Sequence, residues 1–92
     1  MKLDIEPCWS FIGNTVKDQL FCVVQETCEV MHAFKHESQE RLISEIMDVI
    51  GVCVTTLTIL GLGQKEIDKA IEDMHKKNST NGRDYYTRED GK

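Results

Sequence analysis

Apolar side chains recur at steps of three and four along two long segments of the chain, the spacing typical of an α-helix. In the first segment they form one stripe, made of Val16, Leu20, Val23, Val24, Val30, Met31 and Phe34. Asn14 or Thr15 suits the N-cap before this stripe, and Asp18 suits the positive end of the helix dipole. The pattern predicts an amphipathic helix over residues 15–35, preceded by an irregular lead-in over residues 1–13.

The second segment begins after Ser38, another N-cap candidate, and we predict a helix over residues 39–60. Gly61 and Gly63 then act as stop signals. A third amphipathic helix follows and fades near Asn78. Its apolar stripe consists of Ile67, Ala70, Ile71 and Met74.

The stretch from Val49 to Leu60 also has the Val, Ile and Thr content of a β-strand. A helix is favoured because the run continues from Arg41 without a turn residue, and because no second strand-like segment could pair with it. No charged residue follows Asp48 before Lys65, so this helix is apolar nearly all round. Such a helix must be enclosed by others. We therefore predict an all-α bundle of about three helices per chain, completed by a homodimer or homotetramer.

The 92 residues carry 11 basic and 16 acidic side chains, a net charge of −5. This length suits one domain, predicted over residues 14–78, with a polar and flexible tail over 79–92. The acidic balance argues against nucleic acid as a partner. The longest apolar stretch is twelve residues, short of the roughly 18 that a membrane span needs. The four cysteines form no Cys-x-x-Cys pair, which indicates reduced thiols in a cytoplasmic protein.

Two acidic pairs lie on helix faces that otherwise carry apolar residues. They are Glu26-x-x-Glu29 in the first helix and Glu45-x-x-Asp48 in the second. Residues three apart share a helix face. Burying four carboxylates together is costly because each raises the pKa of the others, and a hard divalent cation such as Mg²⁺ removes that cost. The pairs therefore predict a metal site between two helices, with solvated surface charges as the alternative.

The order Gln25-Glu26-x-x-Glu29, then Ser44-Glu45-x-x-Asp48-Val49, resembles the signature of the MazG-like, all-α nucleoside triphosphate pyrophosphohydrolases. The resemblance covers about residues 15–83, and the superfamily includes dimeric dUTPases and phosphoribosyl-ATP pyrophosphohydrolase. Many relatives have Glu-Glu where this chain has Gln25-Glu26, so one accessory acid is missing.

The resemblance implies an obligate oligomer that cleaves a nucleoside triphosphate to a monophosphate and pyrophosphate, in nucleotide-pool house-cleaning. It implies that Mg²⁺, or Mn²⁺ in its place, is held by four side chains: Glu26, Glu29, Glu45 and Asp48. Glu45 or Glu29 is our candidate for the catalytic base. Replacing Glu45 or Asp48 with Ala is expected to abolish the metal-dependent release of pyrophosphate.

Basic and amide side chains follow the third predicted helix, where the resembling family contacts phosphates. Lys77, Asn78 and Arg83 are the candidates for substrate binding. A fraying helix end is the alternative, because the helix dipole favours cations at that end in any case. Trp9, Phe11 or Phe34 could contact the nucleobase of the substrate, although we expect Phe34 to pack in the core.

Other chemistry is less well supported by the sequence. His32 and His36 have metal-ligand spacing on a helix, and Glu29-x-x-His32 resembles one half of a di-iron site, but exposed histidines are the simpler interpretation. No base accompanies a cysteine nucleophile, and Cys53 is expected in the apolar core. The main alternative function is a non-catalytic helical homo-oligomer that acts as an adaptor or regulator.

Overall fold

The computed structural model describes residues 4–80 and 84–86. A short 3-10 helix, η1 (Trp9–Phe11), precedes three α-helices, and these described residues contain no strand. The α-helices are α1 (Val16–His36), α2 (Gln39–Ile59) and α3 (Gln64–Ser79). The predicted all-α fold is confirmed, and the strand alternative for Val49 to Leu60 is wrong.

The helix ends follow the capping residues that the sequence predicts. The Thr15 hydroxyl accepts a hydrogen bond from the Asp18 amide at 3.1 Å, and this fixes the start of α1. At the start of α2, the Ser38 hydroxyl accepts from the Arg41 amide at 3.3 Å. Gly61 has a φ of +90°, a backbone conformation that glycine adopts without steric cost, and it ends the run that began at Gln39.

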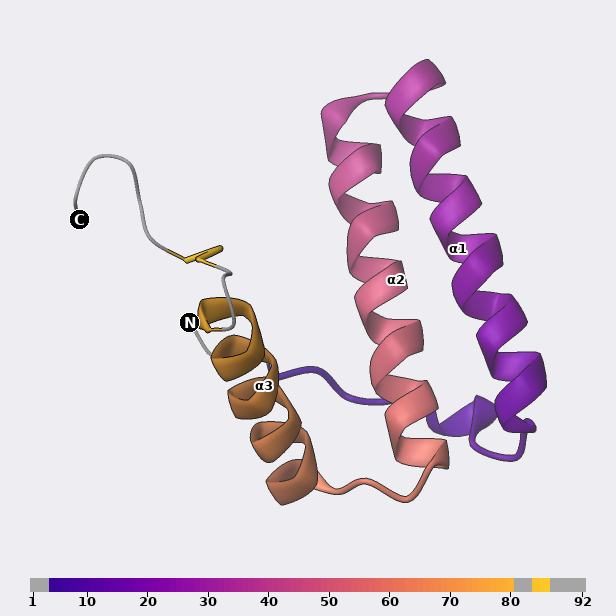
Figure 1. Cartoon of the computed structure of the whole chain (residues 1–92). Helices are drawn as coiled ribbons and strands as arrows, with labels where there is room; N and C mark the ends of the chain where they lie inside the picture. Colours follow the sequence, from indigo (N-terminus) through magenta and orange to yellow (C-terminus); the bar gives the residue numbers. More distant parts are fainter. Residues whose placement is uncertain (1–3, 81–83, 87–92) are drawn as a thin grey trace. The chain divides into compact units, whose positions relative to one another are not determined.

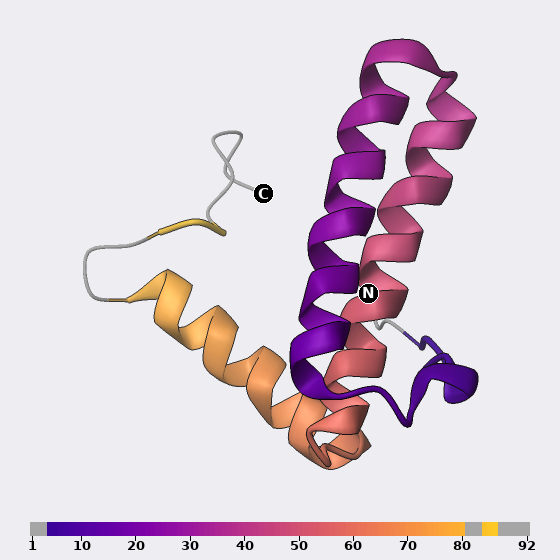
Figure 2. The ribbon, with the colours of Figure 1, turned by 90° about the vertical axis from the view of Figure 1, so that its right-hand side faces the viewer.

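Helices α1 and α2 form an antiparallel pair joined by a tight turn, with their lengths side by side in both views (Figures 1 and 2). The contact between them is unusually polar. Within residues 4–80 and 84–86, Ala33 is the one fully buried apolar residue, while Gln19, Glu45, Thr55 and Thr56 are buried polar residues. The pair therefore packs through small and polar side chains, and through the strip of α1 that lies beside the predicted apolar stripe.

The N-terminal lead-in is tied to α2 by one long-range hydrogen bond. The backbone amide of Cys8 donates to the Thr55 hydroxyl at 2.9 Å, and that hydroxyl donates to the Gly51 carbonyl. Trp9 and Phe11, on η1, are both more than half exposed. The lead-in is thus fixed by backbone hydrogen bonding and not by burial of its aromatic rings.

Large apolar side chains face outward from the helix pair. Phe34 is 69% exposed, so our prediction that it packs in the core of the chain is wrong. Leu20, Val24 and Met31 of the same stripe are exposed as well, whereas Val16, Val23 and Val30 are half-buried, so the stripe is only partly covered within the chain. The other half-exposed residues of the pair are Leu20, Phe21, Val24, Met31, Ile43, Ile46 and Met47.

The chain divides after Gly61 into two units, residues 1–61 and 62–92, and each is described by itself. The second unit contains α3, whose start is fixed by the Glu66 carboxylate accepting a hydrogen bond from the Gly63 amide at 3.1 Å. The single helical domain over residues 14–78 stays a prediction.

Helix α2 also has the length and hydropathy of a helix that crosses a membrane. It has 21 residues, and the mean hydropathy of its most apolar window is 1.8. This similarity rests on length and composition alone. The central helix of a soluble bundle has the same two properties.

Candidate metal centre

Three of the four predicted metal ligands converge between α1 and α2. Glu26, Glu29 and Glu45 each place one carboxylate oxygen so that these atoms all lie within 4.8 Å of one another. The two α1 residues share a face because they are three apart, and Glu45 approaches them from the neighbouring helix. Two oxygens bound to one Mg²⁺ lie at most about 4 Å apart, so only a small inward movement would let these three groups share a cation.

The burial of these carboxylates differs from one to the next. Glu45 is 7% exposed, Glu26 is half-buried and Glu29 is exposed. Among the described residues, Glu26 Oε2 and Glu45 Oε2 are the buried side-chain oxygens that lack a hydrogen-bond partner. A buried carboxylate oxygen without a donor is costly. The arrangement therefore leaves acceptor capacity in the cluster that a cation would satisfy.

The pKa values of two members move in the direction that a crowded acidic cluster produces. Burial raises the pKa of Glu26 above 4.5, and the neighbouring carboxylates of Glu29, Asp48 and Glu45 raise it further. Burial also raises the pKa of Glu45, opposed by the Arg41 guanidinium and reinforced by Glu29 and Asp48. Repulsion among the acids is thus only partly relieved by Arg41, and a divalent cation would relieve it further.

Asp48, the fourth predicted ligand, lies at the edge of the cluster. Its side chain is exposed and does not belong to the group within 4.8 Å. Its charge nevertheless raises the pKa of both Glu26 and Glu45, so it lies within electrostatic reach of them. The structure therefore brings three of the four predicted ligands together and leaves Asp48 beside them.

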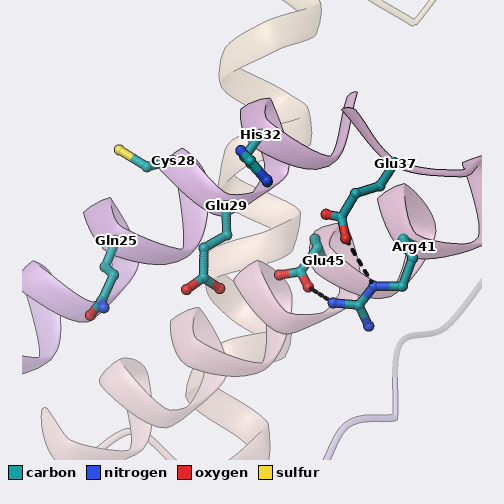
Figure 3. A pocket seen from close by; sticks show the side chains of 7 residues that line it. All are labelled: Gln25, Cys28, Glu29, His32, Glu37, Arg41 and Glu45. Atoms are coloured by element: carbon teal, nitrogen blue, oxygen red, sulfur yellow. Dashed lines mark hydrogen bonds and ion pairs between the residues drawn. The ribbon is translucent and has the colours of Figure 1, made fainter. Parts of the chain in front are cut away.

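An open cavity of about 450 Å³ adjoins the cluster. Gln25, Cys28, Glu29 and His32 line it from α1, and Arg41 and Glu45 line it from α2 (Figure 3). This volume falls within the range of about 300–1,000 Å³ typical of small-molecule sites. A ligand in this cavity would contact the acidic cluster on one side and the Arg41 guanidinium on the other.

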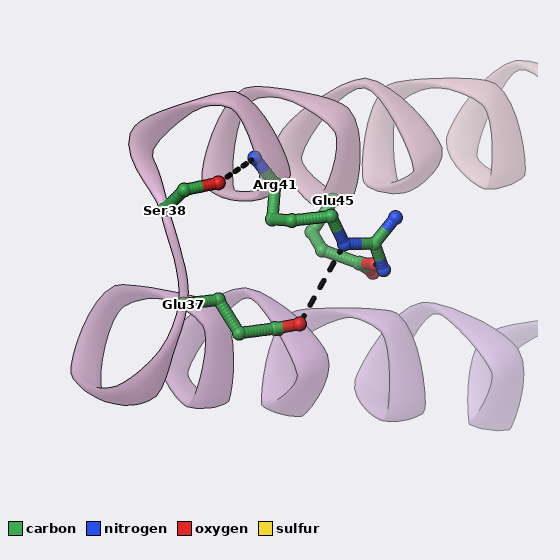
Figure 4. A network of polar contacts seen from close by, with 4 residues as sticks. All are labelled: Glu37, Ser38, Arg41 and Glu45. Atoms are coloured by element: carbon green, nitrogen blue, oxygen red, sulfur yellow. Dashed lines mark hydrogen bonds and ion pairs between the residues drawn. The ribbon is translucent and has the colours of Figure 1, made fainter.

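Arg41 is the residue of this site that the sequence interpretation missed. Its Nη2 lies 2.7 Å from Glu45 Oε1, and its Nε lies 3.6 Å from Glu37 Oε1 (Figure 4). Part of the signal was present in the sequence, because Arg41 and Glu45 are four apart in one helix and so face one another on consecutive turns. Glu37 reaches Arg41 from the C-cap position of α1.

The predicted phosphate contacts belong to the other unit of the chain. Lys77 and Asn78 lie in the last turn of α3, and Arg83 lies outside the described residues. The Asn78 side-chain amide donates to the Tyr86 hydroxyl at 3.2 Å, and the Tyr86 ring meets His75 edge-on at 5.0 Å. Their role in substrate binding stays a prediction.

The histidine and cysteine alternatives gain no support. The rings of His32 and His36 lie 4.9 Å apart, but neither belongs to a group that could hold a metal among the described residues. Cys53 is half-buried, Cys8 and Cys28 are exposed, and all four cysteines are free. Carboxylate chemistry is therefore the chemistry that this geometry favours.

Comparison with known proteins adds no relative to this picture. No family model, no curated protein and no solved structure matches the chain.

Proposed function

We propose that this protein is a Mg²⁺-dependent nucleoside triphosphate pyrophosphohydrolase of the MazG-like, all-α type, which releases pyrophosphate and a nucleoside monophosphate. The observation that carries the proposal is the convergence of Glu26, Glu29 and Glu45, two of which bury an oxygen that lacks a partner. An all-carboxylate donor set suits hard cations that also bind phosphate oxygens. The resemblance of the two acidic motifs to that family supplies the reaction.

The residues of the chain take distinct roles in this proposal. Glu26, Glu29 and Glu45 would hold Mg²⁺, or Mn²⁺ in its place, and Asp48 would join them from the edge of the cluster. The cation would supply polarisation of the phosphates and a lowered pKa for an attacking water. Glu29 is the better candidate for the base, because both Glu29 and Glu45 line the cavity but Glu29 is the more exposed. Lys77, Asn78 and Arg83 would bind the phosphates.

The proposed enzyme acts as at least a homodimer. Support comes from the outward apolar side chains of the helix pair, of which Phe21, Val24 and Phe34 are all more than 60% exposed. A second copy is the occupant we commit to, because the stripe of α3 offers only four apolar residues and cannot match the larger set on α1 and α2. Sedimentation equilibrium at micromolar concentration is expected to give twice the chain mass or more, and a stable monomer would contradict this assignment.

A soluble protein of the cytoplasm fits the same proposal. Glu45 and Asp48 lie within α2, and charges at that depth of a bilayer would be costly. The four free cysteines suit a reducing compartment. We therefore interpret α2 as the central helix of a bundle, without a membrane or a nucleic acid as partner.

The deciding experiment is a screen of canonical and damaged nucleoside triphosphates with Mg²⁺, scored for pyrophosphate. At least one triphosphate is expected to yield pyrophosphate and monophosphate in equal amounts, with no product in excess EDTA. A screen without pyrophosphate would reject the enzyme assignment.

The second candidate is a non-catalytic helical homo-oligomer that acts as an adaptor or regulator. The outward apolar surface favours it, since exposed patches of this kind mark protein interfaces. The two candidates differ in their response to metal. An enzyme gains thermal stability from millimolar Mg²⁺ or Mn²⁺ by mass action, whereas an adaptor does not.

A further inference from the structure

The position of Arg41 in α2 is unfavourable for a cation. It lies in the first turn, where the Ser38 hydroxyl caps its amide and where the helix dipole disfavours positive charge. At this third helical position a Glu or Gln commonly reaches back to complete the cap. Arg41 instead extends forward to Glu45 (Figure 4). Neither the cap nor the helix dipole therefore explains an arginine at this position.

The contacts of Arg41 with the acidic cluster explain why an arginine stands at this position. Its guanidinium lies 2.7 Å from one oxygen of Glu45, while the other oxygen of Glu45 is buried without a partner. Glu45 belongs to the group of three whose oxygens lie within 4.8 Å. Among the described residues, the Arg41 guanidinium is thus the cation that pairs with a candidate metal ligand, and it satisfies only one of the two oxygens of that carboxylate.

Arg41 has two acidic partners of unequal strength. Its own side chain is 56% exposed, and its contact with the partly exposed Glu37 is long, at 3.6 Å, so that pair is weak. The pair with Glu45 is shorter, at 2.7 Å, and the Glu45 side chain is only 9% exposed. The same guanidinium lines the cavity beside the cluster, and its planar fork suits a phosphate as well as a carboxylate.

We propose that Arg41 is a built-in cation that neutralises Glu45 in the metal-free protein and binds a phosphate of the nucleotide once a divalent cation occupies the cluster. This inference rests on the proposed function, because it assigns a role to Arg41 in loading that site. The exchange couples metal and substrate binding. The metal ion replaces Arg41 as the partner of Glu45. The released guanidinium then attracts phosphate into the cavity, where Glu29 and Glu37 would otherwise repel it.

The test measures how one substitution changes the binding of two ligands, for which opposite changes in affinity are expected. Arg41→Gln removes the charge but keeps a polar side chain. Binding of Mn²⁺ alone, measured by calorimetry, is expected to tighten about two- to fivefold, the change that corresponds to removing a weak competing ion pair. Binding of inorganic tripolyphosphate at a fixed free Mn²⁺ concentration is expected to weaken about tenfold, because a charged hydrogen-bond donor is lost.

Arg41→Lys is the matched control, because it keeps the charge and loses the fork. It is expected to bind Mn²⁺ as the unaltered protein does and to bind tripolyphosphate with intermediate affinity. Circular dichroism checks that each variant is folded.

Three results would overturn the inference, and they are distinguishable. If Arg41→Gln weakens Mn²⁺ binding, Arg41 only positions Glu45. If it leaves tripolyphosphate binding unchanged, Arg41 does not contact phosphate. If the unaltered protein binds no Mn²⁺, the proposed function itself fails, and the inference fails with it.

Discussion

The α1–α2 pair buries polar groups in two regions, and the regions differ in whether those groups have hydrogen-bond partners. Near the start of α1 and the end of α2, the buried groups have partners within the chain. Gln19 Oε1 accepts from Asn14, Thr55 bonds both Cys8 and Gly51, and Thr56 donates to the Val52 carbonyl. Nearer the turn between the helices, Glu26 and Glu45 each bury an oxygen without a partner.

This difference separates polar groups that stabilise the fold from the carboxylates to which we assign a cation in the proposed function. A satisfied buried hydroxyl contributes to stability and fixes the lead-in. An unsatisfied carboxylate cluster reduces stability, and native proteins retain such groups chiefly at functional sites. Both regions belong to the same pair of helices. The difference between them therefore comes from the chemistry of the side chains that each region buries.

The largest expected effect tests the region near the turn. Glu45→Ala removes the most buried member of the cluster, and pyrophosphate release should fall by more than about a hundredfold, because even substitutions behind a metal ligand cost about 10–100-fold. Steady-state rates with saturating Mg²⁺ measure this. The matched control is Glu40→Gln, an exposed acid in the first turn of the same helix, which should retain near-normal rates. Equal losses of the rate in both variants would show that the overall negative charge of the helix supports the reaction and that the cluster does not.

The second effect concerns metal and thermal stability. At tenfold above its dissociation constant, Mn²⁺ should raise the melting temperature by about 5 °C or more, since mass action then contributes about 1.4 kcal/mol. Glu45→Gln should abolish this rise and should raise the melting temperature of the metal-free protein, because it removes a charge from the crowded cluster. Differential scanning calorimetry in EDTA and in Mn²⁺ measures both. A lower metal-free melting temperature in Glu45→Gln would mean that the carboxylate is structurally satisfied.

The third effect tests the region with satisfied groups. Thr55→Val keeps the shape of the side chain but removes the acceptor of the Cys8 amide. The free energy of unfolding should fall by about 1–2 kcal/mol, measured by urea denaturation, while the Mn²⁺-induced rise in melting temperature is kept. Thr55→Ser retains the hydroxyl and should lose less. If Thr55→Val removed the metal response, the two regions would not be independent.

The smallest effect is a dependence of stability on pH. The pKa values of Glu26 and Glu45 are raised above 4.5 in the folded chain, so the folded state binds more protons than the unfolded state. Their contribution to stability is therefore complete below about 4.5 and is lost as the pH rises through the raised values. Unfolding free energies measured in EDTA should fall across that window.

The matched variant for this experiment is Glu26→Gln, in which the fall with pH should be shallower. Saturating Mn²⁺ should oppose the fall in the unaltered protein, because the metal competes with protons for the same oxygens. Stability in EDTA that rises with pH through this window would contradict the raised pKa values.

The sequence predicted the helices well, because their signals are local. Thr15, Ser38 and Gly61 set helix ends through bonds and backbone angles within a few residues, and the three-residue spacing placed each acidic pair on one face. The prediction failed for Phe34, because an apolar stripe shows that a face avoids water but does not show which element covers it. It also missed Arg41, because the i,i+4 spacing of charges is common on helix surfaces and acquires meaning only beside a cluster.

The sequence by itself determined the three helices, their ends and the two acidic pairs, since capping, propensity and periodicity act over one or two turns. Only the tertiary structure decided which faces of α1 and α2 meet. That choice buried Glu45, brought it to Glu26 and Glu29, left Asp48 at the edge and turned Phe34 outward. The physical reason is that the rotation of each helix about its axis is set by packing across the pair, and it is this rotation that makes two separate carboxylate motifs into one candidate metal centre.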